Sequence, residues 1–226
     1  MDNRGKSTHV DRVQDQTEGK TVWLRFLIAP PFVVVGLWIH ELVQAQSEPW
    51  LIVDNALERA IPFLPWTIWI YFSFFLFIAA TLIRVERHLF WCFVRSVILA
   101  SIIGWGCVLL IPVSFDRPDP ALIDHQLYRQ IFTFLHEADP SHITFPSLHV
   151  AVTWICCLLL KNQPGRGRRI ALGIAISLST LFTKQHLISD VIGGIGLAWF
   201  SVWMIENNYF LFRRRGTQQA ACVNEE

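Results

Sequence analysis

Charged side chains are scarce in this sequence: they make up 16% of its 226 residues, whereas 53% are hydrophobic. Seventeen phenylalanines and ten tryptophans are also many for a soluble domain of this size. This composition points first to a membrane protein. The formal net charge is only +1, so no strong positive field indicates a nucleic-acid partner.

Cysteines at extracellular positions are also lacking. Four of the five cysteines lie in or beside apolar runs and one lies near the C-terminal end. They are Cys92, Cys107, Cys156, Cys157 and Cys222. The pattern therefore predicts no disulfide framework, and small apolar packing residues instead. The adjacent pair Cys156–Cys157 also lacks the spacing of a metal site.

The first twenty residues lack an apolar run, so they cannot form the core of a cleavable signal peptide. We interpret residues 1–20 as a mobile cytoplasmic tail. Residues 207–226, which include three consecutive arginines, are interpreted as a basic and polar cytoplasmic tail. No internal repeat is evident. The catalytic membrane domain would then occupy residues 21–206.

Six apolar segments predict an all-α polytopic membrane protein with a six-transmembrane-helix bundle, since ~20 helical residues cross a bilayer. The predicted spans are residues 22–43, 63–83, 89–113, 146–160, 170–182 and 186–206. Pro30 and Pro31 predict a kink in the first span. The fifth span is short, and we expect its helix to continue through Thr183 and Lys184.

Basic residues cluster in the two tails and in residues 84–88 and 161–169. Lysine and arginine favour the cytoplasmic side of short loops, so both termini are predicted to be cytoplasmic. Residues 44–62, 114–145 and 183–186 would then lie outside, and the first two are acidic. We expect an integral protein of a bacterial plasma membrane whose active site faces the extracytoplasmic side.

The long outer connection contains a further predicted helix in residues 119–136. Asp119 followed by Pro120 is typical of a helix start. Apolar residues then recur at helical spacing: Ile123, Leu127, Ile131 and Phe134. Two interpretations remain open, a surface helix that covers a site as a lid and a packed connecting helix.

Polar residues interrupt the apolar pattern beside the last predicted span. In a helix, His186 and Asp190 would share a face because they lie four positions apart. The aspartate would accept the Nδ1 proton of the imidazole and leave Nε2 free as a base or nucleophile. The plain alternative is a His–Asp pair that satisfies itself inside a helix bundle.

Two other polar sites also adjoin spans. Pro146 suits a first helical turn, so Ser147 and His149 would lie where unpaired backbone N–H groups bind phosphate. Arg117 offers a planar fork for phosphate oxygens at the end of an earlier span. These cationic groups and helix ends supply positive field, so we expect neither a metal nor another cofactor.

At these residues the sequence resembles the type-2 phosphatidic acid phosphatase superfamily of membrane lipid phosphatases and phosphotransferases. Residues 146–149, Pro-Ser-Leu-His, resemble its second motif, Pro-Ser-Gly-His, with Leu148 in place of glycine. His186 and Asp190 match the end of its third motif. Arg117 and the following proline resemble the end of its first motif. Leu148 would make the site entrance more apolar.

The sequence also departs from the family pattern. Leu110 stands where the first-motif lysine is expected, and Thr180 replaces the third-motif arginine after the matching Ser179. Lys184 would lie one helical turn beyond Thr180, so we expect Lys184 to make the missing phosphate contact. The Thr-Lys-Gln-His and Phe-Pro-Ser-Leu-His stretches, with residues 61–66, resemble the inositol phosphorylceramide synthase-like subgroup.

The resemblance implies a phosphohistidine mechanism. His186 would attack phosphorus, Asp190 would orient its ring, and His149 would protonate the leaving oxygen. The phosphate-binding residues would be Arg117, Ser147 and Lys184. We expect hydrolysis of a lipid phosphate monoester or pyrophosphate at the outer membrane face. Transfer to a hydroxyl acceptor, as in the synthase-like subgroup, is the alternative.

Two further alternatives use the same three residues, His149, His186 and Asp190. A proton-coupled transporter would use them as a proton relay, but it predicts polar residues deep within spans, which are nearly free of them. A zinc site would use them as ligands. The expected partners are a lipid phosphate substrate and the bilayer, with no nucleic acid; protein partners are not specified by the sequence.

Overall fold

The computed structural model describes residues 35–36, 38–39, 41–43, 51–53, 56–138 and 145–223. Side chains are described in these ranges except for Leu51 and residues 208–223. The predicted tail 1–20 and most of the predicted span 22–43, with its two prolines, lie outside the described residues. All six predicted site residues lie within the described ranges.

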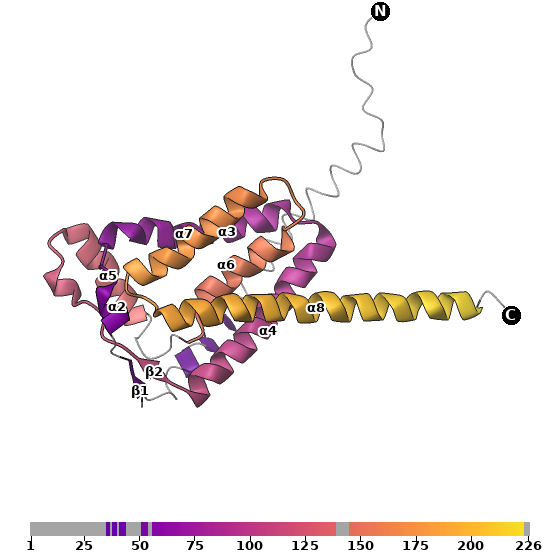
Figure 1. Ribbon diagram of the computed structural model, residues 1–226, viewed down its shortest axis with the longest axis horizontal. Helices are drawn as coiled ribbons and strands as arrows, with labels where there is room; N and C mark the ends of the chain where they lie inside the picture. Colours follow the sequence, from indigo (N-terminus) through magenta and orange to yellow (C-terminus); the bar gives the residue numbers. More distant parts are fainter. Residues whose placement is uncertain are drawn as a thin grey trace, which may run out of the picture.

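Five long helices form the described bundle (Figure 1). They are α3 (Ile68–Arg84), α4 (Arg87–Leu110), α6 (Leu148–Leu159), α7 (Arg166–Phe182) and α8 (Ile188–Val223). Predicted spans two to six each overlap one of these helices. The helix α8 continues beyond residue 206, so the predicted C-terminal tail begins inside this helix.

Shorter elements lie at one end of the bundle (Figure 1). They are β1 (Leu51–Ile52), α2 (Ala56–Ala60), the 3₁₀ turns η1 (Pro65–Thr67) and η2 (Pro120–Leu122), β2 (Val113–Ser114) and α5 (Gln126–Ala138). The strands β1 and β2 pair in parallel, a small departure from the predicted all-α fold. Val53 N extends this pairing by donating to Ser114 O at 2.8 Å. The pairing fixes the segment before α2 against the segment that carries Arg117.

The core lies around α6, which packs against α3, α4, α7 and α8. Ala151 and Ile155 of α6 are fully buried, and Cys156 and Cys157 are buried as predicted for apolar packing residues. Small residues allow α8 to approach closely. A Cβ atom on Gly194 would lie 2.6 Å from the backbone oxygen of Ser147.

Two glycines in the first turns of α8 make close contacts with neighbouring segments. Gly193 lies against Phe145, where a Cβ atom would approach the ring to 2.8 Å, and Gly194 lies against the start of α6. At Gly196, no neighbouring segment of the described residues lies within 4 Å of the Cβ position. The close packing is therefore concentrated in the first two turns of α8, beside the candidate site.

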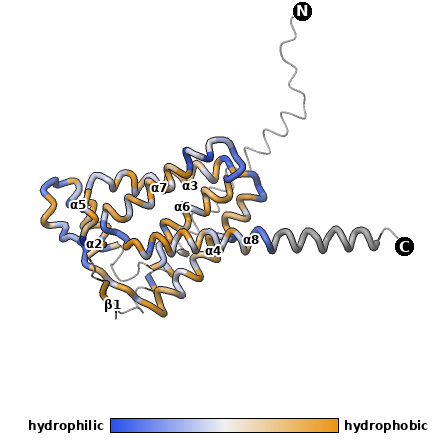
Figure 2. The backbone as a smooth tube through the Cα atoms, in the orientation of Figure 1, coloured by the Kyte–Doolittle hydropathy of each residue, from blue (hydrophilic) through white to orange (hydrophobic). Residues whose placement is uncertain are grey.

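Three helical segments are long and apolar enough to cross a membrane: Pro65–Arg84, Arg87–Leu110 and Ile188–Asn207. The helix α6 is apolar but spans only 12 residues, and α7 begins in the basic loop at Arg166 and spans 17. Of the six predicted spans, these three are supported within the described residues. Hydrophobic segments occupy the middle of the bundle and hydrophilic ones gather at its two ends (Figure 2).

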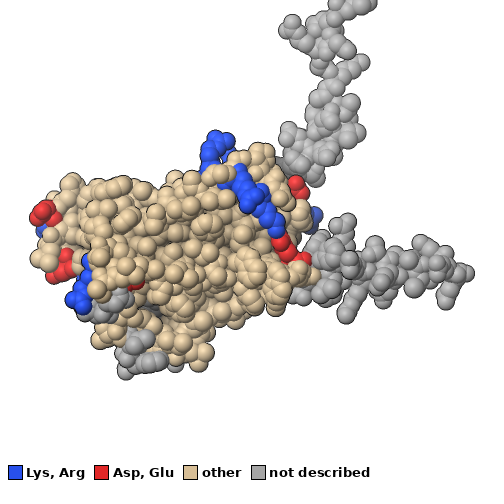
Figure 3. All heavy atoms as spheres, viewed as in Figure 1, with Lys and Arg blue, Asp and Glu red and all other residues tan. Residues whose placement is uncertain are grey.

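Charged side chains follow the same pattern on the visible face (Figure 3). The turns between α3 and α4 and between α6 and α7 lie at one end of the bundle, and α2, α5 and the strands lie at the other (Figure 1). The segments that the charge distribution assigns to one membrane side therefore share one end of the protein.

The predicted helix at 119–136 is divided into η2 and α5. Asp119 begins η2, and its carboxylate accepts a hydrogen bond from Ala121 N at 2.8 Å. Phe132 is buried and meets Phe63 edge-to-face at 5.1 Å, so α5 matches the packed-helix interpretation. Of the predicted apolar face, Ile123 and Ile131 join this packing, whereas Phe134 is 67% exposed.

Candidate active site

The turn that connects α7 to α8 carries two of the predicted site residues. The helix α7 ends at Phe182, so its predicted extension through Thr183 and Lys184 is wrong. The backbone N–H groups of Gln185 and His186 both donate to Thr180 O, at 3.0 and 3.2 Å, which folds the chain back. Lys184 occupies this turn with a φ of 54°.

This turn also changes the predicted relation between Lys184 and Thr180. The spacing predicts Lys184 on the same helical face one turn later, but the two residues do not belong to one continuous helix. Thr180 is fully buried, and its hydroxyl donates to Ser177 O at 2.7 Å. Any phosphate contact by Lys184 must therefore come from the turn rather than from a helix face.

His186 and Asp190 lie together, although they do not share a helix. His186 precedes α8, whose first residue is Ile188. Its Nδ1 lies 3.5 Å from Asp190 Oδ2, which is near enough for an ion pair but longer than a good hydrogen bond. Asp190 is fully buried, and Oδ2 accepts from Leu187 N at 2.9 Å. The carboxylate therefore orders the turn that carries His186.

Ser147 caps the start of α6. Its Oγ accepts from Val150 N at 3.2 Å, and its own N–H donates to Asp190 O at 3.1 Å. The predicted placement of Ser147 at a helix start is confirmed, with Pro146 just before the cap rather than in the first turn. Ser147 is fully buried and its hydroxyl serves the cap, so its phosphate contact stays a prediction.

His149 lies in the first turn of α6 and is held between two aromatic rings of α3. The ring centroids of Tyr71 and Phe74 lie 4.2 and 3.8 Å from that of the imidazole, with interplanar angles of 22° and 28°. Sequence reasoning missed these partners because α3 is aromatic on all sides. Their spacing of three positions was the available signal.

Leu148 has a different role from the one expected. It packs on Gly104 of α4, where an added Cβ atom would lie 2.8 Å from Leu148 Cδ2. The leucine that replaces the family's glycine therefore fills space between α6 and α4. The expectation that it makes the site entrance more apolar is not supported by this contact.

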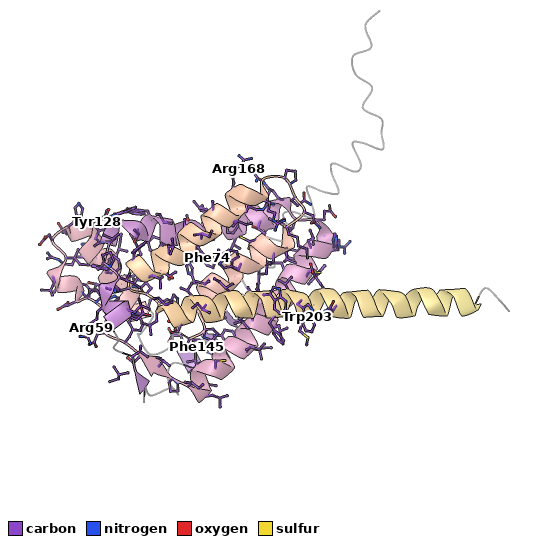
Figure 4. The ribbon with its side chains drawn as sticks, viewed as in Figure 1. Arg59, Phe74, Tyr128, Phe145, Arg168 and Trp203 are labelled. Carbon is purple, nitrogen blue, oxygen red and sulfur yellow. The ribbon has the colours of Figure 1, made fainter. Side chains whose placement is uncertain are left out.

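A cavity of about 650 Å³ brings Arg117, Lys184 and His186 together. Its other lining residues are Val53, Glu58, Arg59, Ile61, Pro62, Phe63, Phe115, Asp116, Pro118 and Leu187. Arg117 Nη2 donates to Gln185 O at 3.3 Å, next to His186 in the chain. Arg59 and Arg168 lie toward opposite ends of the bundle (Figure 4), so this cavity is remote from the basic turn before α7.

Ser147, His149 and Asp190 do not line this cavity among the described residues. Asp190 and Ser147 adjoin it, because Asp190 contacts His186 and its backbone oxygen accepts from Ser147 N. Five of the six predicted residues are therefore linked to the cavity, whereas His149 follows Ser147 by two positions in α6 and stacks on rings of α3. Within the described residues, no three His, Cys, Asp or Glu side chains are grouped to hold a metal ion.

Lys184 and Glu58 form a contact that sequence reasoning missed. Lys184 Nζ donates to the backbone oxygen of Glu58 at 2.7 Å. Burial lowers the pKa of the Lys184 ammonium, and the negative charge of Glu58 partly offsets this shift. Nothing in the spacing of the sequence links these residues, which are separated by 126 positions.

The fold and site define a helical protein with membrane-type apolar helices and a cationic cavity at one end. A family model described as the PAP2 superfamily matches residues 43–204, more than half of the chain. The chain belongs to this superfamily, whose members are phosphatases or phosphotransferases. Searches of curated proteins and of solved structures find no match to the chain.

Proposed function

We propose that the protein hydrolyses a lipid phosphate monoester or pyrophosphate through a phosphohistidine, at the extracytoplasmic face of a bacterial plasma membrane. The observation that carries this proposal is the shared cavity of Arg117, Lys184 and His186. Two cations beside an imidazole suit a phosphoryl group, whose negative charge must be stabilised during transfer. The PAP2 match supports this class of reaction.

In the proposed mechanism, His186 Nε2 attacks phosphorus and forms a P–N bond while the bond from phosphorus to the lipid oxygen breaks. His149 gives a proton to that oxygen, and the lipid alcohol or lipid phosphate leaves. His149 then takes a proton from water, which attacks phosphorus, and inorganic phosphate leaves His186. Asp190 stabilises the positive charge of the phosphorylated imidazole, and Arg117 and Lys184 hold the non-bridging oxygens.

Transfer to a hydroxyl acceptor is the second candidate. The cavity that holds the cations also has apolar walls, including Val53, Phe63 and Phe115. Such walls would suit a second lipid and exclude water from the phosphoenzyme. Rapid phosphate release that does not depend on an acceptor would rule out this candidate, whereas a new phosphoester formed only with acceptor would support it.

The proposed function is tested by assaying phosphate release by the purified protein from a panel of lipid monophosphates and diphosphates. We expect His186→Ala to abolish turnover, and His149→Ala to retain radiolabel from the substrate in an acid-labile, base-stable form. His88→Ala is a matched control, because this exposed histidine lies in the first turn of α4, at the opposite end of the bundle. Near-normal turnover by His186→Ala would falsify the mechanism.

A further inference from the structure

The short helix α2 contacts the turn of His186 at two points. The backbone oxygen of Glu58 accepts from Lys184 Nζ at 2.7 Å. The side-chain Oε1 of Glu58 accepts from the N–H of Ile188 at 2.8 Å. These two contacts fall on either side of His186 in the sequence. One residue from a distant segment therefore binds both ends of the turn.

The second contact gives a hydrogen-bond partner to a backbone N–H group at the start of α8. The first N–H groups of a helix have no partner within the helix, and a negative charge near them is favourable. Asp190 Oδ2 accepts from Leu187 N, and Glu58 accepts from Ile188 N. Neither His186 nor Leu187 is a residue type that usually caps a helix, so Glu58 supplies from α2 what a capping residue usually supplies locally.

We propose that Glu58 is a positioning residue of the active site, which holds Lys184 and the start of α8 so that His186 faces the cavity. This proposal rests on the proposed function of His186 as the nucleophile. The two hydrogen bonds that Glu58 accepts form a clamp on this turn. Misplacement of a reacting group by about 1 Å costs up to ~100-fold in rate, so loss of this clamp should slow the reaction. A purely structural cap would instead affect stability alone.

The effect of Glu58 on Lys184 can be measured through the pKa of the Lys184 ammonium. The charged and titratable side chains that line the cavity are Glu58, Arg59, Asp116, Arg117, Lys184 and His186. Asp116 is exposed, whereas Glu58 is half-buried. Glu58 raises the pKa of Lys184 against the larger effect of burial. Removal of the Glu58 charge should therefore let Lys184 lose its proton at a lower pH.

The test compares Glu58→Ala, which removes the side-chain acceptor and its charge but keeps the backbone oxygen, with Glu58→Gln, which keeps a side-chain acceptor oxygen and removes the charge. We measure kcat and KM on the best substrate of the lipid phosphate panel. We also measure acylation of Lys184 against pH by mass spectrometry, with Lys161 as internal reference. Glu206→Gln is the control, because Glu206 binds Lys161 at 2.9 Å in an exposed ion pair at the turn between α6 and α7.

We expect Glu58→Ala to lower kcat about tenfold or more with little change in KM, and Glu58→Gln to recover most of that loss. Both variants should shift Lys184 acylation to lower pH, while Lys161 in these variants and Lys184 in the control protein stay unchanged. Wild-type kcat or an unchanged Lys184 profile in Glu58→Ala would overturn the proposal. So would a kcat loss that disappears when the assay is run well below the melting temperature.

The acylation measurement separates this proposal from the proposed function. If no lipid phosphate is turned over, the proposed function fails, and acylation of Lys184 still reports on Glu58. A shift at Lys184 alone then supports the clamp. An unshifted Lys184 in both Glu58 variants overturns the clamp whatever the activity of the protein.

Discussion

The imidazole of His149 stacks on the ring of Phe74 with 3.8 Å between their centroids. Tyr71 covers the other face of the imidazole, so the ring is fixed in its plane from both sides. The stack therefore links the packing of α3 to the proposed acid of the reaction.

This link predicts the effect of Phe74→Leu. Leucine keeps most of the apolar contact but removes the stacked face, so we expect kcat to fall about tenfold, equivalent to ~1.4 kcal/mol. The measurement is steady-state phosphate release, with thermal unfolding followed in parallel. Phe75→Leu is the control on the same helix, because Phe75 is 61% exposed. Equal kcat in the two variants would contradict a role for the stack.

The alkaline limit of activity should depend on Lys184. Its pKa is lowered from 10.5, so Lys184 loses its charge, and the proposed phosphate contact, at lower pH than an ordinary lysine. Lys184→Arg stays protonated at all relevant pH values, so it should retain partial activity and extend it to higher pH. Lys184→Ala should lose most activity. An unchanged alkaline limb in Lys184→Arg would show that Lys184 does not set this limit.

Membrane orientation can be tested by cysteine accessibility. The charge distribution predicts that residues 114–145 lie outside and residues 161–169 inside. A cysteine at Pro120 should therefore react with an impermeant thiol reagent in intact cells, and one at Gly165 should react only after permeabilisation. The unsubstituted protein measures the background from its native cysteines. The reverse labelling pattern would contradict the proposed extracytoplasmic site.

The contact between Leu148 and Gly104 predicts a compensating pair. Leu148→Ala should lower the free energy of unfolding by ~2 kcal/mol, because it removes packed methyl groups from between α6 and α4. Gly104→Ala should also destabilise, since the added Cβ atom would lie 2.8 Å from Leu148 Cδ2. The double variant should be more stable than the sum of the two losses predicts. Strict additivity, measured by denaturant unfolding, would contradict the contact.

Sequence patterns predicted the helices well where apolar runs were long. The helices α3 and α4 lie close to the predicted residues 63–83 and 89–113. The end of α7 was mispredicted because its last turn has no glycine or proline. The reversal there depends on Thr180 O, which accepts from two backbone N–H groups, and no local composition reveals such a bond.

The candidate site could be predicted only in part, because several of its contacts join residues that lie far apart in the chain. The proximity of His186 and Asp190 followed from their spacing, although the helix expected to produce it begins only at Ile188. Glu58 and Tyr71 were missed because their partners are distant in the chain. Contacts of this kind depend on tertiary packing, which a single sequence does not encode as a local pattern.

The hydrogen bond from Ser147 N to Asp190 O joins the segments that carry the two proposed catalytic histidines. It is made entirely by main-chain atoms, so no side-chain replacement at either residue removes its donor or acceptor, proline at Ser147 excepted. The alignment of the two segments therefore does not depend on which side chains these residues carry. A chain built in this way tolerates unusual residues at neighbouring motif positions, such as Leu148 and Thr180, while its two halves stay in register.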